Sequence, residues 1–493
     1  KDGRHSRGSG NPVILPELIE TIQIIMKKQG ARMDMKNKKK TVMDETLKRV
    51  EKVFNAFKEL GKEDTPSILL YEKIKSGYES LEEDEKEGLF RSIVEQIEVP
   101  KERIESLVDD IVKCGQNDKR WPRLMADLRV QSYSPRLIFL RKVSHFPGGL
   151  KFLLDFRGDL LAAQRYSKFD LTPLDLDIVL LFEMWFQEGF LYLEEITLDS
   201  SYRQMELIKN RDFVHPMASI EEMGRRLGKD RRCFTLYHRL LPYEPIIFIE
   251  VVLTVGLATN ITEIMAGAEN GKKRGRVDTA IFYSINNTQN GLAGLGLGKM
   301  LIGKVVDYIR QENEKIKTFA TLSPVPGFLE GYLRPLLKGK DENFILKHTD
   351  VITFFSKKAC SRILGNGGTE IPESDQFNRA LLDILSQEAW AEDDSLKKAL
   401  RNALVKIAYH YIANEKNVRN KPLNPVAGFH LGNGATVSMK NINFLGNPLT
   451  RGLKESCGIM VNYIYTSSWL SQFRRSFRWI DRMEIKGIFR QRR

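Results

Sequence analysis

A glycine-rich turn between an apolar segment and an amphipathic one constrains the fold of this chain most. Residues 280–285, Ala-Ile-Phe-Tyr-Ser-Ile, are typical of a buried strand, and residues 299–310 repeat apolar side chains at helical spacing. Between them, Gly294, Gly296 and Gly298 alternate with other residues. Glycines let backbone N–H groups approach a phosphate closely, and the start of a helix adds positive potential there. The segment therefore predicts an anion-binding strand–turn–helix unit.

Spacing excludes two common phosphate-binding loops. A Walker A loop needs glycine where Ala293 stands and a hydroxyl residue where Met300 stands. A Rossmann turn needs its third glycine at the position of Lys299. The remaining pattern resembles the pyrophosphate loop of acetyltransferase-type acyl-CoA domains, and a generic glycine-rich turn stays open as the alternative. If the resemblance holds, the coenzyme A phosphates are bound by Ala293, Gly294, Leu295, Gly296, Leu297, Gly298 and Lys299.

Further segments point to one family. Residues 319–328 end a predicted strand with Ser323 before two prolines, and residues 424–435 place His430 in a turn-rich stretch beside a strand. Shorter matching motifs are Val214-His-Pro216, Arg231-Arg-Cys-Phe234, Tyr283-Ser284 and Ser456-Cys-Gly-Ile-Met460. In order and spacing, these segments resemble the malonyl-CoA decarboxylase family from about residue 120 to about residue 465.

The resemblance implies a fold, an activity and residue roles. The fold would be α+β and multidomain: an all-helical N-terminal domain followed by an acetyltransferase-like (GNAT-like) α/β catalytic domain with a helical insertion. The activity would be conversion of malonyl-CoA to acetyl-CoA and carbon dioxide, a step of fatty-acid metabolism. His430 would be the proton donor, Ser323 the proton acceptor or carboxylate anchor, and Tyr463 a supporting residue. No metal or organic cofactor is expected, because the thioester itself accepts the electron pair. The family also implies a homo-oligomer, a tetramer.

The residues alone leave other interpretations open. His430 fits a hydrogen-bonded core histidine, and Ser323 fits an ordinary strand-end cap. In the catalytic interpretation, His430 can be protonated at working pH, because imidazole titrates near pH 6.5. Five basic residues are candidates for the 3′-phosphate of coenzyme A or for a solvated basic loop: Arg225, Arg226, Lys229, Arg231 and Arg232. His215 is assigned a role in the fold.

Changes in pattern divide the chain into four parts. Residues 1–40 are predicted to be a basic flexible segment, 41–189 a helical scaffold or oligomerisation domain, 190–466 the catalytic acyl-CoA domain, and 467–493 a divergent basic tail. Strands are expected at residues 195–199, 233–238, 246–254, 280–285, 318–322 and 459–465. Helices are expected at 299–310 and 327–337, and a helical insertion at about 376–414.

Composition narrows the class of protein. No apolar run approaches the roughly 18 residues of a membrane span. Four scattered cysteines without Cys-x-x-Cys spacing predict buried thiols in a reducing compartment, with neither a zinc site nor disulfides. The net charge of +13 suits a polyanionic small substrate, and no nucleic-acid-binding motif accompanies it. We expect the mitochondrial matrix, with cytoplasm or peroxisome as alternatives; the chain lacks a final Ser-Lys-Leu.

Three rival functions remain. A coenzyme A-dependent acyltransferase would pass an acyl group to an amine. A non-catalytic coenzyme A-binding protein would bind without turnover. A nucleic-acid binder would use the basic tail and would bind in a salt-sensitive manner.

Overall fold

The computed structural model describes residues 45–62, 67–98, 101–114, 118–228, 230–266, 276–365, 373–418 and 420–466. The predicted basic segment 1–40, the tail 467–493 and Lys229 lie outside these residues. The chain divides into two compact units, residues 1–184 and 185–493. None of the helices in the described ranges is both long and apolar enough to cross a membrane.

The first unit is helical, as predicted. Helical residues 45–62 are followed by α2 (Ile68–Glu79), α3 (Glu83–Gln96), α4 (Lys101–Lys113), α5 (Trp121–Gln131), α6 (Pro135–Ser144), α7 (Gly149–Ala163) and α8 (Thr172–Trp185). Aromatic rings form its core: the Phe156 ring lies 5.0 Å from Phe90 and 5.1 Å from Tyr78. A buried ion pair, Arg157 to Asp175 at 2.7 Å, joins α7 to α8. Apolar packing therefore holds this unit together.

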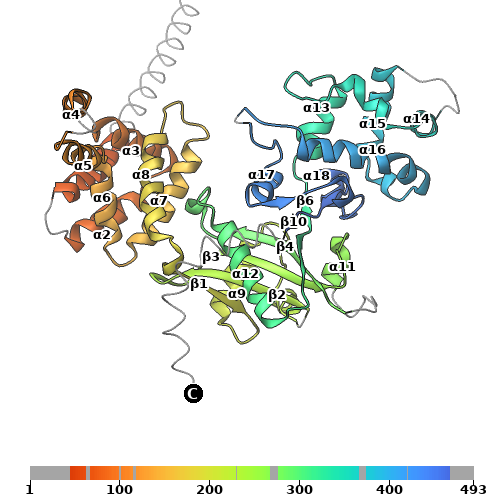
Figure 1. Ribbon diagram of the computed structural model, residues 1–493, viewed down its shortest axis with the longest axis horizontal. Helices are drawn as coiled ribbons and strands as arrows, with labels where there is room; N and C mark the ends of the chain where they lie inside the picture. The colour runs from red at the N-terminus through yellow and green to blue at the C-terminus, as the bar shows by residue number, and fades with distance from the viewer. Residues whose placement is uncertain are drawn as a thin grey trace, which may run out of the picture. The chain divides into compact units, whose positions relative to one another are not determined.

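The second unit is built on a seven-stranded sheet of mixed direction (Figure 1). Its strand order is β1 (Leu191–Ile196), β2 (Arg231–His238), β3 (Leu241–Thr254), β4 (Thr279–Asn287), β5 (Thr318–Thr321), β10 (Ile464–Tyr465) and β7 (Ala435–Thr436). Neighbouring strands are antiparallel except β4 and β5, which are parallel. A helical region followed by a mixed α/β domain confirms the predicted fold class.

Helices cover both faces of this sheet. Adjacent residues of a strand point to opposite faces. Cys233 packs in a cluster with α9 (Tyr202–Arg211) and α10 (Ile220–Arg225), whereas the ring of Phe234 contacts Tyr308 of α12 (Leu297–Glu312). Helix α11 (Ile261–Ala266) packs on Val252 and Ile281. Helix α12, the predicted helix after the glycine turn, therefore covers the face opposite α9 and α10.

A separate group of helices lies within the second unit (Figure 1). It contains α13 (Arg334–Leu337), α14 (Lys357–Leu364), α15 (Ser374–Leu385) and α16 (Asp394–Ala413), and α17 (Pro425–Gly432) and α18 (Thr450–Ser456) follow it. The insertion predicted at about 376–414 corresponds to α15 and α16, so the group begins earlier than predicted. The helix expected at 327–337 is a π-helical turn, Phe328–Leu333, that continues into α13.

Two strand predictions need correction. The strand expected at 195–199 lies earlier, at β1, because the chain turns after Ile196 and Ser200 N–H donates to the Thr197 carbonyl. The strand expected at 459–465 is two strands in different sheets. β9 (Met460–Val461) pairs with β6 (Ser323–Pro324) and β8 (Ile442–Asn443), whereas β10 pairs with β5 and β7. Asn462 breaks the strand, because its side-chain amide donates to the carbonyls of Ala258 and Thr321.

A gap opens in the sheet next to β4. The parallel pairing of β4 with β5 ends at Phe282 and Thr321, and the last link is Leu322 N–H to the Phe282 carbonyl at 3.1 Å. The chain then leaves β4, and Ser323 pairs with β9 instead. On its other side β4 carries a bulge that leaves Tyr283 without a partner in β3. The strands therefore separate at this point, and the space between them is available for a site.

Candidate active site

Ser323 and His430 form a buried pair although 107 positions separate them in the sequence. The Ser323 Oγ lies 3.1 Å from His430 Nε2, and both residues are at least 94% buried. The Ser323 hydroxyl also lies 2.9 Å from the Thr321 Oγ1, to which it donates. In that arrangement His430 Nε2–H donates to Ser323. We call these two residues the dyad.

His430 lies on a helix, which corrects the prediction of a turn-rich stretch. Asn424 caps α17, because its side-chain oxygen accepts from Ala427 N–H at 2.8 Å, and Pro425 occupies the first helical position. The Asn424 amide also donates to the Pro326 carbonyl at 3.0 Å, which ties the start of α17 to the segment after Ser323. The Asn-Pro pair is a helix-start signal that the sequence interpretation missed.

Two tyrosines fix the imidazole of His430. Its ring stacks on Tyr463, with ring centres 4.7 Å apart and planes at 26°. Its Nδ1 lies 3.0 Å from the hydroxyl of Tyr465. Tyr463 therefore supports the ring by stacking, while its own hydroxyl is buried without a partner among the described residues. Tyr465 was not predicted, although alternation along a strand would place residues 463 and 465 on one face.

Burial determines the charge state of His430. It lowers the pKa of the imidazole to about 3, so that the ring is neutral near pH 7. His430 can therefore act as the predicted proton donor only after it takes up a proton. A neutral ring with Nε2–H directed at Ser323 accepts a hydrogen bond from Tyr465 at Nδ1, which satisfies both nitrogens.

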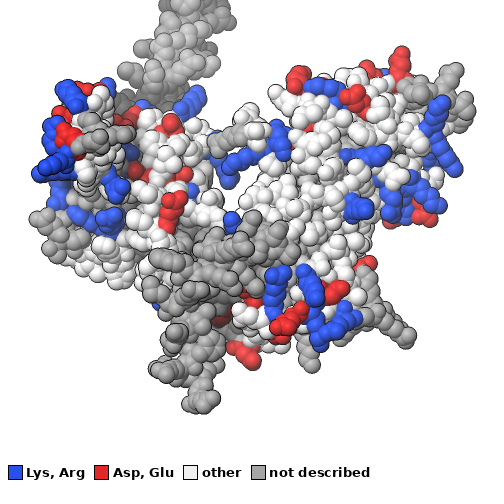
Figure 2. Space-filling view, in the orientation of Figure 1, with Lys and Arg blue, Asp and Glu red and all other residues white. Residues whose placement is uncertain are grey.

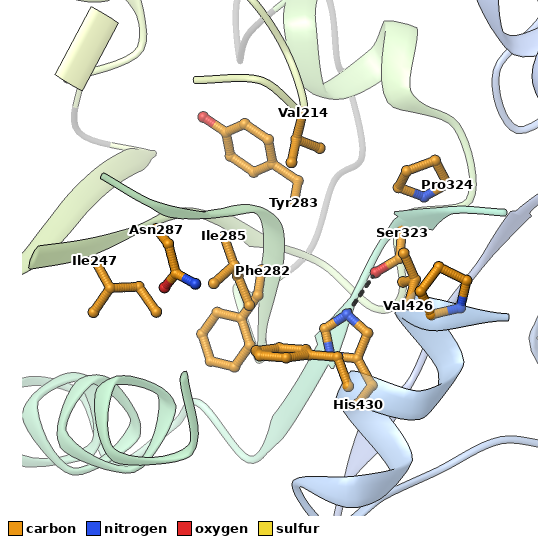
Figure 3. A pocket seen from close by; sticks show the side chains of 12 residues that line it. Val214, Ile247, Phe282, Tyr283, Ile285, Asn287, Ser323, Pro324, Val426 and His430 are labelled. Atoms are coloured by element: carbon orange, nitrogen blue, oxygen red, sulfur yellow. Dashed lines mark hydrogen bonds between the residues drawn. The ribbon is translucent and has the colours of Figure 1, made fainter. Parts of the chain in front are cut away.

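The dyad lies in a cavity of about 280 Å³, the dyad cavity (Figure 3). Apart from the dyad, most of its wall is apolar: Val214, Ile247, Phe282, Ile285, Val426 and Phe429. Figure 3 shows the Ser323 hydroxyl directed at the His430 ring, and the Tyr283 hydroxyl directed away from it. The cavity occupies the gap between β4 and β6.

One close contact joins the glycine turn to α17, the helix that carries His430. Gly294 and Gly296 have φ values of 84° and 70°, which side chains other than glycine rarely adopt. Gly296 caps α12, and Gly298 lies in its first turn. A Cβ at Gly298 would lie 2.3 Å from Cζ of Phe429, the residue before His430. The glycine therefore lets α17 approach the turn, and the exposed Lys299 follows it.

Three of the predicted basic residues are not free surface groups. Arg226 is buried and donates to Asp212, Glu222 and the His215 carbonyl. Arg232 is paired with Glu195 and Glu312. Arg231 is also buried, whereas Arg225 is exposed. The interpretation of this group as a solvated loop is therefore wrong for Arg226 and Arg231.

The charge distribution and the cysteines bear on the remaining alternatives. Figure 2 shows Lys and Arg side chains in several separate groups on this face, with acidic side chains among them. All four cysteines are buried, as predicted, and none of them forms a disulfide within the described residues; burial raises the pKa of the Cys457 thiol to about 12. Within the described ranges, no three His, Cys, Asp or Glu side chains lie close enough to hold a metal ion.

Family models match most of the chain. The model described as the malonyl-CoA decarboxylase C-terminal domain matches residues 189–478, and that of the N-terminal domain matches residues 98–186. A mitochondrial malonyl-CoA decarboxylase from Anser anser anser is 34% identical over 69% of this chain and 66% of its own length. The one from Mus musculus is 35% identical over 66% of this chain and 64% of its own length. The chain thus spans slightly less than two thirds of these relatives.

Solved structures of malonyl-CoA decarboxylases are also similar to this chain. The malonyl-CoA decarboxylase from Rhodopseudomonas palustris is 28% identical, with a TM-score of 0.68, over 88% of this chain and 97% of the other. The one from Agrobacterium vitis is also 28% identical, with a TM-score of 0.68, over 84% and 92%.

Proposed function

Because the chain belongs to the malonyl-CoA decarboxylase family, we propose that it converts malonyl-CoA to acetyl-CoA and carbon dioxide. One observation carries the proposal: a buried serine–histidine pair lies in an apolar cavity, at a gap in the sheet and beside a glycine turn. In fatty-acid metabolism, this reaction would remove malonyl-CoA.

The substrate would enter along the glycine turn. Backbone N–H groups of residues 293–299 at the start of α12 would bind the coenzyme A phosphates, and Lys299 would add a positive charge. The acyl end would then reach the dyad through the gap beside β4. The contact of Gly298 with Phe429 would keep the turn and the dyad in fixed relation.

Loss of carbon dioxide makes two demands on the site. The carbon–carbon bond to the carboxylate breaks, and its electron pair moves into the thioester as an enolate. An apolar wall favours this step, because it stabilises an ionised carboxylate less than water does. Hydrogen-bond donors near the thioester oxygen stabilise the enolate, a contribution that is typically about 3 to 4 kcal/mol per donor.

The α-carbon must then receive one proton. The reaction consumes a proton overall, and burial keeps His430 neutral near pH 7. The substrate carboxylate is a negative charge that would enter the same cavity, and it would raise the pKa of His430. His430 would therefore take up its proton with the substrate, and Ser323 would hold the carboxylate or relay the proton to carbon.

Location and assembly are further proposals, supported by the names of the relatives and by the family resemblance. We propose the mitochondrial matrix, because the curated relatives at 34–35% identity are named as mitochondrial, with cytoplasm or peroxisome as alternatives. We also propose a homo-oligomer, a tetramer by family resemblance. Cell fractionation would test the first proposal, and light scattering of the purified protein would test the second.

Carbon dioxide release from malonyl-CoA, measured without an acyl acceptor, tests the activity. We expect carbon dioxide and acetyl-CoA in equal amounts. An acyltransferase would turn over only when an amine is added, and a non-catalytic binding protein would bind malonyl-CoA without consuming it. Either result would reject the proposal.

A further inference from the structure

A second and larger cavity adjoins the dyad cavity. It has a volume of about 880 Å³ and is lined by Arg225, Arg226, Arg231 and Arg451, with Glu222 and Glu455. We call it the basic cavity. Three residues line both cavities: Val214, Pro324 and Val426. The two spaces are therefore neighbours that share one wall.

Most charges of the basic cavity are neutralised within the protein. Arg226 is paired with Asp212 at 3.2 Å and with Glu222 at 2.6 Å. Arg451 is paired with Glu455 at 2.8 Å. These two arginines are occupied by carboxylates of the chain itself.

Arg231 differs from these two. Arg231 is the first residue of β2 and is only 9% exposed. It nevertheless has no ion-pair partner among the described residues. Its Nε is a buried donor without an acceptor there, and the Nε2 of His215, which lines the same cavity, is also without a partner. The two residues that carry these unsatisfied atoms therefore both line one cavity.

A guanidinium that is largely buried and has no ion-pair partner is costly, because burial removes part of its hydration and no carboxylate of the described chain replaces it. A ligand from outside the chain that pairs with this group would offset that cost. The planar fork of arginine suits the two oxygens of a carboxylate. We propose that the basic cavity binds a carboxylate anion, with Arg231 as the principal ligand. The proposal rests on the proposed function only for the source of that carboxylate.

The strand pairing favours a carboxylate over a coenzyme A phosphate as the partner of Arg231. Arg231 lies opposite Val252, and Val252 lies opposite Ile281 of β4. The loop that leads to the glycine turn begins after Asn287, six residues further along that strand. At about 3.3 Å per residue, Ile281 and Asn287 are about 20 Å apart along β4. Arg231 therefore lies near the end of β4 that is remote from this loop.

The carboxylate has two possible sources with the same chemistry. One is the free end of the malonyl group, captured before it moves to the dyad cavity. An arginine at the reacting position itself would stabilise the carboxylate and slow its loss, so capture and reaction take place in separate cavities. The other source is a free dicarboxylate that binds beside the substrate.

Thermal unfolding of the full chain with free malonate, at constant ionic strength, tests the site directly. Malonate is expected to raise the unfolding midpoint of the wild type and of Arg239→Gln, a control at an exposed arginine outside the cavity. The rise should be absent in Arg231→Gln and reduced in Arg231→Lys, which keeps the charge but not the fork. Without malonate, Arg231→Gln should unfold no earlier than the wild type, because it removes an unpaired buried charge.

Kinetics of carbon dioxide release separate the sources. If the malonyl group is bound, Arg231→Gln raises KM for malonyl-CoA about tenfold or more, with affinity for acetyl-CoA unchanged. If a free dicarboxylate is bound, KM is unchanged and inhibition by malonate is lost. The proposal is overturned if Arg231→Gln matches the wild type in KM, malonate inhibition and malonate-dependent midpoint. A wild type that releases no carbon dioxide would reject the activity alone, since the thermal measurement still decides on the site.

Discussion

The dyad cavity and the basic cavity share a wall but differ in the charge of the side chains that line them. The dyad cavity has apolar walls, and its titratable imidazole is kept neutral by burial. The basic cavity is lined by four arginines, one of them buried without a partner in the described part of the chain. A cavity without standing charge suits the loss of a carboxylate, and a cavity with standing charge suits its capture. Charge would thus enter the dyad cavity only with the substrate.

The largest expected effect is at the dyad. His430→Gln removes the proton donor and keeps a side chain of similar size, so that kcat should fall by about 10²- to 10⁴-fold. KM should change by only a few fold, because the glycine turn binds the coenzyme A part. Steady-state kinetics check this, with the exposed His145→Gln as the control. Equal losses in both variants would place the effect outside the dyad.

A smaller loss is expected from Gly298→Ala. The added Cβ would lie 2.3 Å from the Phe429 ring, so the ring must move and α17 with it. We expect kcat/KM to fall about tenfold, in line with the sensitivity of catalysis to misplacement of reacting groups. The double variant Gly298→Ala/Phe429→Leu should recover much of this loss, because leucine is shorter than the ring. Gly331→Ala is the control, since its Cβ would meet no atom within 4 Å.

How far the sequence predicts this site depends on the kind of contact. The glycine turn follows from a local pattern, because glycine spacing is visible in one segment. Ser323 and His430 were assigned to the site through the family resemblance, since as isolated residues they fit a strand-end cap and a core histidine. Tyr465 and Thr321 could not be chosen in the same way, because their contacts depend on how β5 and β10 pair. The neutral state of His430 could not be predicted from the sequence either, because the residues that bury its side chain are distant in the sequence. The Asn424-Pro425 pair could have been recognised in the sequence as the start of a helix, but the sequence analysis did not identify it.

Tyr465→Phe should have a modest effect on the imidazole. It removes the hydrogen bond at His430 Nδ1, a contact of 3.0 Å, and keeps the ring. A hydrogen bond is worth about 0.5 to 1.5 kcal/mol, so kcat should fall about 2- to 10-fold. The pH dependence of kcat should shift as well, because Tyr465 acts on the imidazole and not on the substrate. Tyr243→Phe, at an exposed tyrosine, should leave both quantities unchanged.

The last effects concern stability rather than activity, and they have opposite signs in the two regions. Glu250 lies 3.4 Å from the guanidinium of Arg226. Burial and the charge of Asp212 raise the pKa of Glu250 to about 8. The folded chain therefore holds a proton that the unfolded chain releases, and stability falls as pH rises from about 4.5 to 8. His430, with its pKa lowered to about 3, costs stability as pH falls below about 6.5.

Chemical denaturation across this pH range separates the two groups. Glu250→Gln should flatten the loss of stability that occurs as pH rises from about 4.5 to 8, and His430→Gln the loss that occurs as pH falls from about 6.5 to 3, each by up to about 1.4 kcal/mol per pH unit. If both variants flatten the loss in the same direction of pH change, the assignment of charge states is wrong.

Proton uptake on ligand binding tests most directly whether charge reaches the dyad only with the substrate. The ligand is a coenzyme A thioether that ends in a carboxylate, which has no carbonyl to accept electrons and so cannot lose carbon dioxide. Calorimetry near pH 7, in buffers of different ionisation enthalpy, counts the protons taken up. We expect about one proton for the wild type and none for His430→Gln. Binding to the wild type without proton uptake would contradict the account.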